Sequence, residues 1–300
     1  MNTPKVSIVI LNWNGWADTV ECLESLYRIT YKNYEVIVVD NASSNNSIDK
    51  IKEWASGKSE VASDFLTYNP QNKPIRCVEL SEEELRGDPD VVKKKKNLGG
   101  IENKKLFLVK NAKNYGFAKG NNIATKSILD ENESEYVLLL NNDTVVAPDF
   151  LNELVGVAES DREAAIVGPK MYFYNYNNKK NVIWYGGGKI NWKKYPIYQH
   201  IDEYKEGDGI LDSTCKETAW VSGACMLIKK SKISPLLDES YFFGCEDVDK
   251  CLKTRKAGHK IFYVPSAVVW HKVGASRRKT FKKRIEKNMV DLKLIFKNFF

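Results

Sequence analysis

Short apolar runs alternate with segments of helical periodicity along the first half of the chain. Residues 6–11 and 35–39 are nearly continuous runs rich in β-branched residues, a pattern typical of strands buried on both faces of a parallel sheet. Between them, apolar residues recur at helical spacing over residues 18–28. Further strands are predicted at 105–109 and 136–140, and further helices at 120–129 and 148–158. This alternation predicts an α/β fold with a Rossmann-like, doubly wound, mostly parallel central sheet over residues 1–158.

The periodicity fades between residues 56 and 104. Acidic Glu82–Glu84 is followed there by basic Lys93–Lys96. Opposite charge blocks this close together satisfy each other, so we predict a solvated surface insertion at 56–104.

A smaller, mixed half is predicted over residues 159–271. Tyr, Trp and Gly dominate residues 166–192, which indicates irregular sheet. A helix is predicted at 247–257, short strands at 260–264 and 268–270, and an amphipathic helix at 281–299. The organisation that follows is one domain over residues 1–271 and a tail over residues 272–300.

The composition is that of a globular chain, with 43% hydrophobic and 28% charged residues among 300. No apolar run reaches the roughly 18 residues of a membrane span, and no signal-peptide pattern precedes the first strand. The six cysteines include no Cys-x-x-Cys pair, so we expect reduced thiols and a cytoplasmic location.

The net charge of +7 is concentrated in the tail. Residues 272–300 contain ten Lys or Arg and only Glu286 and Asp291 as acids, above an apolar stripe at helical spacing. Such helices lie on anionic membranes, and they also pack on protein cores or partner subunits, so peripheral contact with the inner face of the membrane, core packing and a homodimer all remain open. Nucleic-acid binding ranks below these alternatives because no aromatic-interleaved basic motif accompanies the charge.

The strand at 136–140 ends abruptly in polar groups, Asn141-Asn142-Asp143. Carboxylate and amide oxygens at the carboxyl end of a strand can hold a hard divalent cation against a diphosphate. An ordinary Asn/Asp turn is the alternative. The second strand likewise ends in Asp40, which a simple helix cap would also explain.

Five further segments, in order along the chain, form a larger pattern together with these acids. They are Val38–Ser43, Asn114–Asn122, Trp220–Cys225, Phe242–Asp249 and Val269–Lys272. Together with Asn141–Asp143, they resemble the family 2 glycosyltransferases of the GT-A fold, most of all the branch with rhamnosyltransferases and galactofuranosyltransferases. The resemblance covers nearly the whole chain and leaves residues 56–104 unaccounted for.

The resemblance implies a nucleotide-sugar donor and assigns residues to it. Asn12, Trp13 and Asp40 would surround the nucleobase and ribose. The residues assigned to the rest of the donor are Asn121, Asn122, Asn141 and Asn142.

A divalent cation, Mn²⁺ or Mg²⁺, is implied as cofactor, with Asp143 and His271 as its ligands. The chain departs from the family's Asp-x-Asp motif at Asn141, a neutral amide, so Asp143 carries the assignment. Imidazole favours Mn²⁺ somewhat over Mg²⁺. His271 as a satisfied core side chain is the alternative.

Asp247 matches the family's catalytic base, with Glu246 orienting the acceptor. An inverting transfer needs a carboxylate within hydrogen-bond reach of the acceptor hydroxyl. A capping acid, stabilised as the anion at a helix start with a lowered pKa, is the alternative. The acceptor side would also include Ser222, Gly223 and Ala224, whose small side chains allow close approach.

These assignments predict a metal-dependent inverting glycosyltransferase that moves a sugar from a UDP- or dTDP-linked donor to a hydroxyl of a saccharide or lipid-linked acceptor. One alternative is a nucleotidyltransferase that makes a sugar nucleotide, but it needs a Gly-rich basic loop after the first strand, and Asn12–Gly15 is not one. A non-catalytic nucleotide- or sugar-binding module is the other. The absence of Gly-x-Gly-x-x-Gly after the first strand argues against a dinucleotide oxidoreductase.

Overall fold

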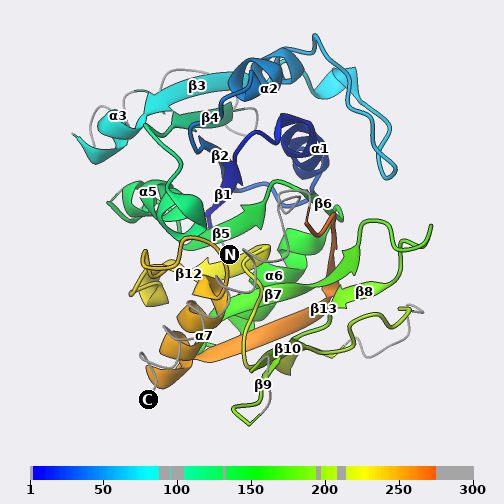
Figure 1. The fold of residues 1–300 in the computed structure, drawn as a ribbon, viewed down its shortest axis with the longest axis vertical. Helices are drawn as coiled ribbons and strands as arrows, with labels where there is room; N and C mark the ends of the chain where they lie inside the picture. Colours follow the sequence, from blue (N-terminus) through cyan, green and yellow to red (C-terminus); the bar gives the residue numbers. More distant parts are fainter. Residues whose placement is uncertain are drawn as a thin grey trace.

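The computed structural model describes residues 3–87, 95, 105–130, 133–193, 197–207 and 214–274. In this part of the chain one large, mostly parallel sheet forms the centre of the molecule (Figure 1). Its strands run in the order β11-β13-β7-β12-β5-β1-β2-β4-β3, with β6 added on β13 and β8 on β7. The predicted α/β architecture with a mostly parallel central sheet is therefore confirmed.

The first half of the chain builds five neighbouring parallel strands. They are β1 (Val6–Asn12), β2 (Tyr34–Asp40), β3 (Arg76–Ser81), β4 (Lys105–Lys110) and β5 (Tyr136–Asn141). The helices between them are α1 (Trp16–Leu26), α2 (Ser47–Ala55) and α5 (Gly116–Asp130). Right-handed crossovers place α1 and α2 on one face of the sheet, and α5, which leads back from β4 to β5, on the other. Both faces are thus covered, and the apolar strand residues are buried.

The insertion prediction is wrong for residues 76–81. This segment forms β3, which pairs in parallel with β4 and closes the sheet at that edge. Val78 and Leu80 alternate toward the core and are buried there. The short helix α3 (Glu82–Arg86) follows, capped by the Ser81 side chain, and the 3-10 turn η1 (Pro70–Asn72) precedes β3. The expected pairing of opposite charges is seen where Lys95 pairs with Glu84.

The second half of the chain extends the same sheet and adds a separate two-stranded antiparallel sheet, formed by residues 188–190 and 198–200. Its elements are β6 (Thr144–Val146), α6 (Phe150–Ser160), β7 (Ala164–Phe173), β8 (Ile183–Tyr185), β9 (Gly188–Ile190), β10 (Tyr198–His200), β11 (Lys216–Glu217), β12 (Cys225–Lys229), η3 (Lys230–Lys232), α7 (Glu246–Lys256) and β13 (Lys260–His271). The antiparallel strand β12 joins β5 to β7, and β13 runs parallel to β7. The mixed character predicted for this half is confirmed.

Two local predictions in this half differ from the structure. Irregular sheet was expected from residue 166 onward, but β7 is a long buried strand of the main sheet, and only β8 to β10 are short pieces. The two short strands predicted at 260–264 and 268–270 form one strand, β13, whose register shifts between Val264 and Val268. Pro265 lies at this irregularity, because proline cannot donate a ladder hydrogen bond.

All six cysteines lie in the described residues and are free thiols, as expected. Over the same residues, every helix falls short of the length and apolar character needed to cross a bilayer. The predicted helix at 281–299 and nearly all of the basic tail lie outside the described residues.

Candidate active site

The carboxyl ends of β1 and β2 meet in a tight hydrogen-bonded group around Asp40. Asn12 Nδ2 donates to Asp40 Oδ1 at 2.7 Å, and Ser43 donates to the same carboxylate from its hydroxyl at 2.6 Å and from its backbone N–H at 3.0 Å. Asn12 is fully buried and also accepts from Thr19 in α1, so its role here is to position Asp40 and the start of α1. Asp40 is thereby held in one orientation at the edge of the sheet.

Trp13, the next residue, is 47% exposed and is therefore available to a ligand. The loops on either side turn sharply, because Asn14 and Ala42 adopt left-handed backbone conformations with φ of 55° and 57°. Residues other than glycine have a strained backbone at positive φ, and such strain tends to concentrate at functional sites. The exposed Trp13 ring thus follows directly after Asn12, which holds the Asp40 carboxylate, and the assignment of these residues to a nucleobase stays a prediction.

Asn41 was given no role in the sequence analysis, yet it organises the next loop. Its Nδ2 donates to Asn114 Oδ1 at 2.9 Å and to the Gly116 carbonyl at 3.1 Å, and its Oδ1 accepts from Asn111 and the backbone of Tyr115. The position of this polar residue directly after a buried strand was the sequence feature that could have indicated its role. Asn41 ties the end of β2 to the start of α5.

Asn121 and Asn122 are both almost completely buried in α5. Asn121 Nδ2 donates to the Phe117 carbonyl at 2.9 Å, and Asn122 Nδ2 donates to the Leu237 carbonyl at 2.8 Å. The structure does not bring either side chain into hydrogen-bond contact with the Asp40 group. They connect α5 to itself and to the segment that leads into α7.

The end of β5 places its three polar residues against different partners. Asn142 Nδ2 donates to Thr19 Oγ1 at 3.0 Å and so faces α1. Asn141 donates its backbone N–H to the Ala224 carbonyl at 2.9 Å, which joins the end of β5 to the loop at 222–224. Asp143 points elsewhere, to His271.

Asp143 and His271 form a buried pair although 128 residues separate them. The pairing of β6 with β13 sets Thr144 opposite His271, and His271 Nε2 lies 3.0 Å from Asp143 Oδ1. Burial would raise the pKa of Asp143, but the adjacent His271 outweighs it and holds this pKa below its usual range. Both side chains are only 6% exposed.

This pair fits a divalent cation that is shared with a ligand. Carboxylate and imidazole are both ligands of Mn²⁺, and His271 Nδ1 is buried without a hydrogen-bond partner among the described residues. No group of three or more His, Cys, Asp or Glu side chains in that part of the chain could hold a metal alone. Two protein ligands suffice where phosphate oxygens and water complete the coordination, as in many Mg²⁺ and Mn²⁺ nucleotide sites.

Asp247 is the second residue of α7, which follows a strained turn. Gly244 and Cys245 both have positive φ, 98° and 68°, and the unusual value at Cys245 aims the residues that follow. Asp247 Oδ2 accepts from the Gly223 backbone N–H at 2.9 Å and Oδ1 from Val248 N–H at 2.8 Å. The predicted grouping of Asp247 with the 222–224 loop is therefore present.

The pKa of Asp247 differs from the pKa expected of a capping acid. The alternative considered in the sequence analysis implied a lowered pKa at a helix start; instead burial raises the pKa of Asp247, despite the two backbone donors and the charge interaction with His200, which lower it. A carboxylate with a raised pKa is a better proton acceptor.

Small residues pack closely around this carboxylate. A Cβ on Gly223 would lie 3.3 Å from the Phe117 ring and 3.4 Å from Asp247 Cβ, so little space remains there. Ser222 and Ala224 are both buried, and Ser222 Oγ accepts from the Ala224 backbone N–H. Glu246, the adjacent acid, is buried at 5% exposure. The residues expected on the acceptor side thus occupy one continuous region.

An aromatic row of Trp184, His200 and Trp220 connects the two halves of the site, and the sequence analysis gave none of these three a role in it. The Trp184 ring lies edge-on between His271 and His200, with centroid distances of 4.4 and 4.9 Å. His200 Nδ1 lies 2.7 Å from the Trp184 carbonyl, and the Trp220 ring is 5.3 Å from His200. The Tyr, Trp and Gly content of residues 166–192 was the available signal. Trp184 therefore contacts both His271, of the Asp143–His271 pair, and His200, which interacts with Asp247.

Comparison with known proteins bears on the family and the fold. Residues 4–289 match the family described as Glycosyltransferase like family 2. The rhamnosyltransferase WbbL of Escherichia coli strain K12 is 27% identical over 187 residues, which cover 56% of this chain and 65% of that protein.

Two solved structures share the fold at 16% identity. GalNAc-T7 with UDP, GalNAc and Mn²⁺ has a TM-score of 0.62 and covers 90% of this chain and 44% of its own. The mannosyltransferase PcManGT from Pyrobaculum calidifontis, in complex with GDP-Man and Mn²⁺, has a TM-score of 0.58 and covers 99% and 64%. The chain spans less than two thirds of the length of each of these three proteins.

The structural likeness confirms the predicted GT-A fold, and the family match extends over most of the sequence, including every site segment described above. The chain therefore belongs to glycosyltransferase family 2.

Proposed function

We propose that the protein is a metal-dependent inverting glycosyltransferase that uses a UDP- or dTDP-linked sugar donor and a hydroxyl of a saccharide or lipid-linked acceptor. The observation that carries the proposal is the buried Asp143–His271 pair at the ends of β5 and β13. Asp247 supports it, because this carboxylate has a raised pKa and is held on the loop that also binds the end of β5.

The donor nucleotide binds at the carboxyl ends of β1 and β2. Trp13 offers an exposed ring for the base, and Asp40 is oriented by Asn12 and Ser43 to accept hydrogen bonds from hydroxyl or N–H groups. Ligands of open α/β sheets bind at this edge, outside the carboxyl ends of the strands.

The diphosphate is placed at Asp143 and His271, which would hold the divalent cation. When bound, the cation supplies Lewis-acid stabilisation of the negative charge on the departing diphosphate. Asp143 and His271 contribute by their fixed geometry, because their mutual contact and their burial leave both side chains little freedom.

Asp247 accepts the proton of the acceptor hydroxyl. As the acceptor oxygen forms its bond to the anomeric carbon, the bond from that carbon to the diphosphate oxygen breaks, and the configuration inverts. The backbone N–H groups of Gly223 and Val248 keep the carboxylate in place. Glu246, Ser222 and Ala224 form the nearby wall that orients the acceptor.

A transfer assay tests the proposal directly. The full chain is incubated with Mn²⁺, a panel of UDP-, dTDP- and GDP-linked sugars and saccharide acceptors, and release of the nucleoside diphosphate is measured. Because a relative carries the name rhamnosyltransferase, a rhamnosyl donor heads the panel. The anomeric configuration of the product, read by NMR, decides between inversion and retention.

The two alternatives give different results. A nucleotidyltransferase would release no nucleoside diphosphate in this assay, but in a parallel incubation with a nucleoside triphosphate and a sugar 1-phosphate it would release pyrophosphate. A non-catalytic module would bind donor and release nothing. Either result, in place of acceptor-dependent release of nucleoside diphosphate, would contradict the proposal.

The basic tail supports an additional part of the proposal. Residues 272–300 carry ten basic and two acidic side chains, and each basic residue near an anionic leaflet contributes about 1 kcal/mol of attraction. We therefore assign the tail to peripheral contact with the inner face of a membrane, where a lipid-linked acceptor would be presented. A homodimer and packing on the core are the outcomes that would replace this assignment.

A further inference from the structure

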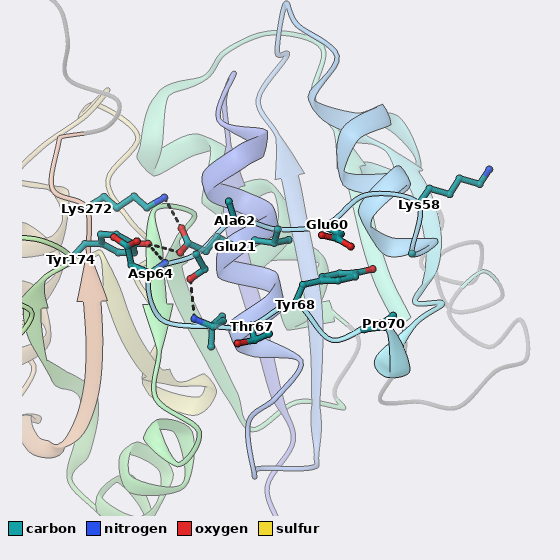
Figure 2. Close-up of a pocket in the computed structure, with 14 residues that line it drawn as sticks. Glu21, Lys58, Glu60, Ala62, Asp64, Thr67, Tyr68, Pro70, Tyr174 and Lys272 are labelled. Atoms are coloured by element: carbon teal, nitrogen blue, oxygen red, sulfur yellow. Dashed lines mark hydrogen bonds and ion pairs between the residues drawn. The ribbon is translucent and has the colours of Figure 1, made fainter.

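A large cavity in the described part of the chain lies beside α1, not over Asp247. It measures about 990 Å³, opens broadly to solvent, and is lined by residues of α1, the loop at residues 57–70, Tyr174 and Lys272 (Figure 2). The loop belongs to the segment that the resemblance left unaccounted for. Its volume is at the upper end of the roughly 300–1,000 Å³ typical of small-molecule sites.

The outer wall of the cavity is anchored to the ends of β7 and β13. The Phe65 ring packs against Tyr174 and Trp270, each with its centroid 4.8 Å away. The Asp64 backbone N–H donates to Tyr174 Oη at 3.1 Å, and Lys180 Nζ donates to the Asp64 carbonyl at 2.5 Å. On its other side the loop is tied to α1, because the Asn69 backbone N–H donates to Glu24 at 3.4 Å. The loop is therefore fixed on both sides of the cavity.

The floor of the cavity is a charge network that already satisfies itself. Lys272 Nζ lies 2.6 Å from both Asp18 and Glu21, and Tyr174 Oη donates to Glu21 at 2.7 Å. The Lys272 ammonium group is thus neutralised by two carboxylates and would attract a phosphate only weakly.

The remaining charges make the cavity acidic. Glu60 and Asp64 also line it, and neither forms an ion pair within the described residues. Lys58 lines the rim, but its side chain extends away from the other lining residues in Figure 2. A nucleotide, a phosphate or an acidic sugar would be repelled here, because like charges disfavour one another at short range.

A metal ion is also a poor occupant, because no group of three or more acidic, histidine or cysteine side chains in the described residues converges. Carboxylates that accept hydrogen bonds, the hydroxyls of Ser63 and Thr67 and the rings of Tyr68 and Tyr174 instead suit a ligand with many hydroxyl groups and apolar ring faces. Neutral saccharides have this chemistry.

The cavity is also connected to the candidate active site. Lys272 follows His271 directly, and its backbone N–H donates to the Asp143 carbonyl at 3.0 Å. Tyr174 donates its backbone N–H to the His271 carbonyl at 2.9 Å. Lys272 and Tyr174 therefore line the cavity with their side chains and bind the backbone of Asp143 and His271 with their N–H groups.

We propose that this cavity is a second saccharide-binding site, distinct from the transfer site, that holds a neutral part of the acceptor glycan. The proposal rests on the function proposed above for its acceptor class. It assigns a role to residues 57–70, which hold the ligand while a hydroxyl elsewhere on the glycan reacts at Asp247.

The test measures equilibrium binding of the full chain to neutral oligosaccharides of two to six hexose or deoxyhexose residues, without donor or metal. Ala62 lines the cavity and is exposed, so Ala62→Trp fills the space without disturbing the core, and Ala62→Ser is its matched control. We expect binding at least tenfold weaker in Ala62→Trp and unchanged in Ala62→Ser. Melting curves verify that both variants are folded.

A second pair of variants tests the chemistry of the lining. Glu60→Gln combined with Asp64→Asn removes both carboxylates at nearly constant shape and should weaken binding tenfold or more. Glu83→Gln, at an exposed position of α3 outside the cavity, should leave it unchanged. Failure of every neutral oligosaccharide to bind, equal binding by Ala62→Trp, or a preference for acidic sugars would overturn the proposal.

These results are separable from those of the transfer assay. Saccharide binding without donor can fail while donor-dependent transfer succeeds, in which case only the second site is wrong. Conversely, binding that depends on the cavity in a protein that transfers no sugar would leave the site standing as a saccharide site and would contradict the proposed activity.

Discussion

Replacing Asp247 by Asn separates a catalytic base from a structural cap at the start of α7. The amide keeps the shape of the side chain but cannot take up the proton of an acceptor hydroxyl. General-base catalysis contributes about 10²- to 10⁴-fold to a rate, which corresponds to about 2.7–5.4 kcal/mol of transition-state stabilisation. We expect Asp247→Asn to lose transfer within this range and to bind donor as the parent does.

The structure also sets the cost of this change to folding. Asp247 accepts two backbone hydrogen bonds, from Gly223 at 2.9 Å and from Val248 at 2.8 Å. The Asn carbonyl oxygen can keep one of them, whereas the other N–H would face an NH₂ donor, at a cost of about 1–3 kcal/mol. This is smaller than the roughly 5–15 kcal/mol stability of a typical domain, so the variant should remain folded.

The pH dependence gives an independent readout. Because burial raises the pKa of Asp247 in the folded protein, its loss of charge should limit the rate of the parent on the acid side at a pH above the ordinary aspartate value of about 3.9. Transfer should fall as pH decreases through this raised pKa, and the residual activity of Asp247→Asn should lack that step.

Asp238→Asn is the matched control. Asp238 also accepts a backbone N–H, from Ser240 at 3.0 Å, in the segment before α7, and it has no proposed role in the reaction. Its variant should transfer within a few-fold of the parent. The reasoning fails if Asp247→Asn does the same, or if its pH profile retains the acid limb of the parent; the base would then lie elsewhere.

Four further results are expected. Asp143→Ala and His271→Ala should each abolish the Mn²⁺-dependent part of donor binding measured by calorimetry with and without EDTA, and unchanged affinity would contradict the metal assignment. His200→Gln should move the acid limb of the rate profile to higher pH, because the charge interaction with His200 lowers the pKa of Asp247; an unmoved limb would contradict that interaction. Burial lowers the pKa of Lys250 to about 8, so the unfolded chain binds more protons between about pH 8 and 10, and the melting temperature of the parent should rise over that range relative to Lys250→Met, whereas parallel curves would refute the shift. Truncation after Ser276 should remove salt-sensitive co-sedimentation with anionic vesicles and preserve donor binding; loss of a dimer or of the fold instead would place the tail in an interface or in the core.

The sequence by itself determined the layered α/β architecture and the edge at which ligands bind. The apolar runs at residues 6–11 and 136–140 are local signals, because strands buried on both faces need apolar residues throughout. Polar residues such as Asp40 and Asp143 stand out where those runs stop, and parallel topology brings such positions to one edge. These features depend on neighbours in the chain, so they can be predicted without the fold.

The tertiary structure alone decided which polar groups come into contact and how deeply each of them is buried. Residues 76–81 look like part of a charged surface segment, yet pairing with β4 buries Val78 and Leu80, because a strand at a sheet edge needs only alternate apolar residues. Resemblance named Asp143 and His271 together, but the pairing of β6 with β13 sets their 3.0 Å contact.

The same limit applies to the environment of Asp247, the proposed base. The pKa of Asp247 is raised by groups that bury it, and the row of Trp184 and His200 beside it is assembled from β8 and β10. The cavity beside α1 depends on Phe65 packing between Tyr174 and Trp270, more than 100 residues away in sequence. Burial, pKa and cavities arise from contacts between distant segments, and local sequence patterns carry no information about those contacts.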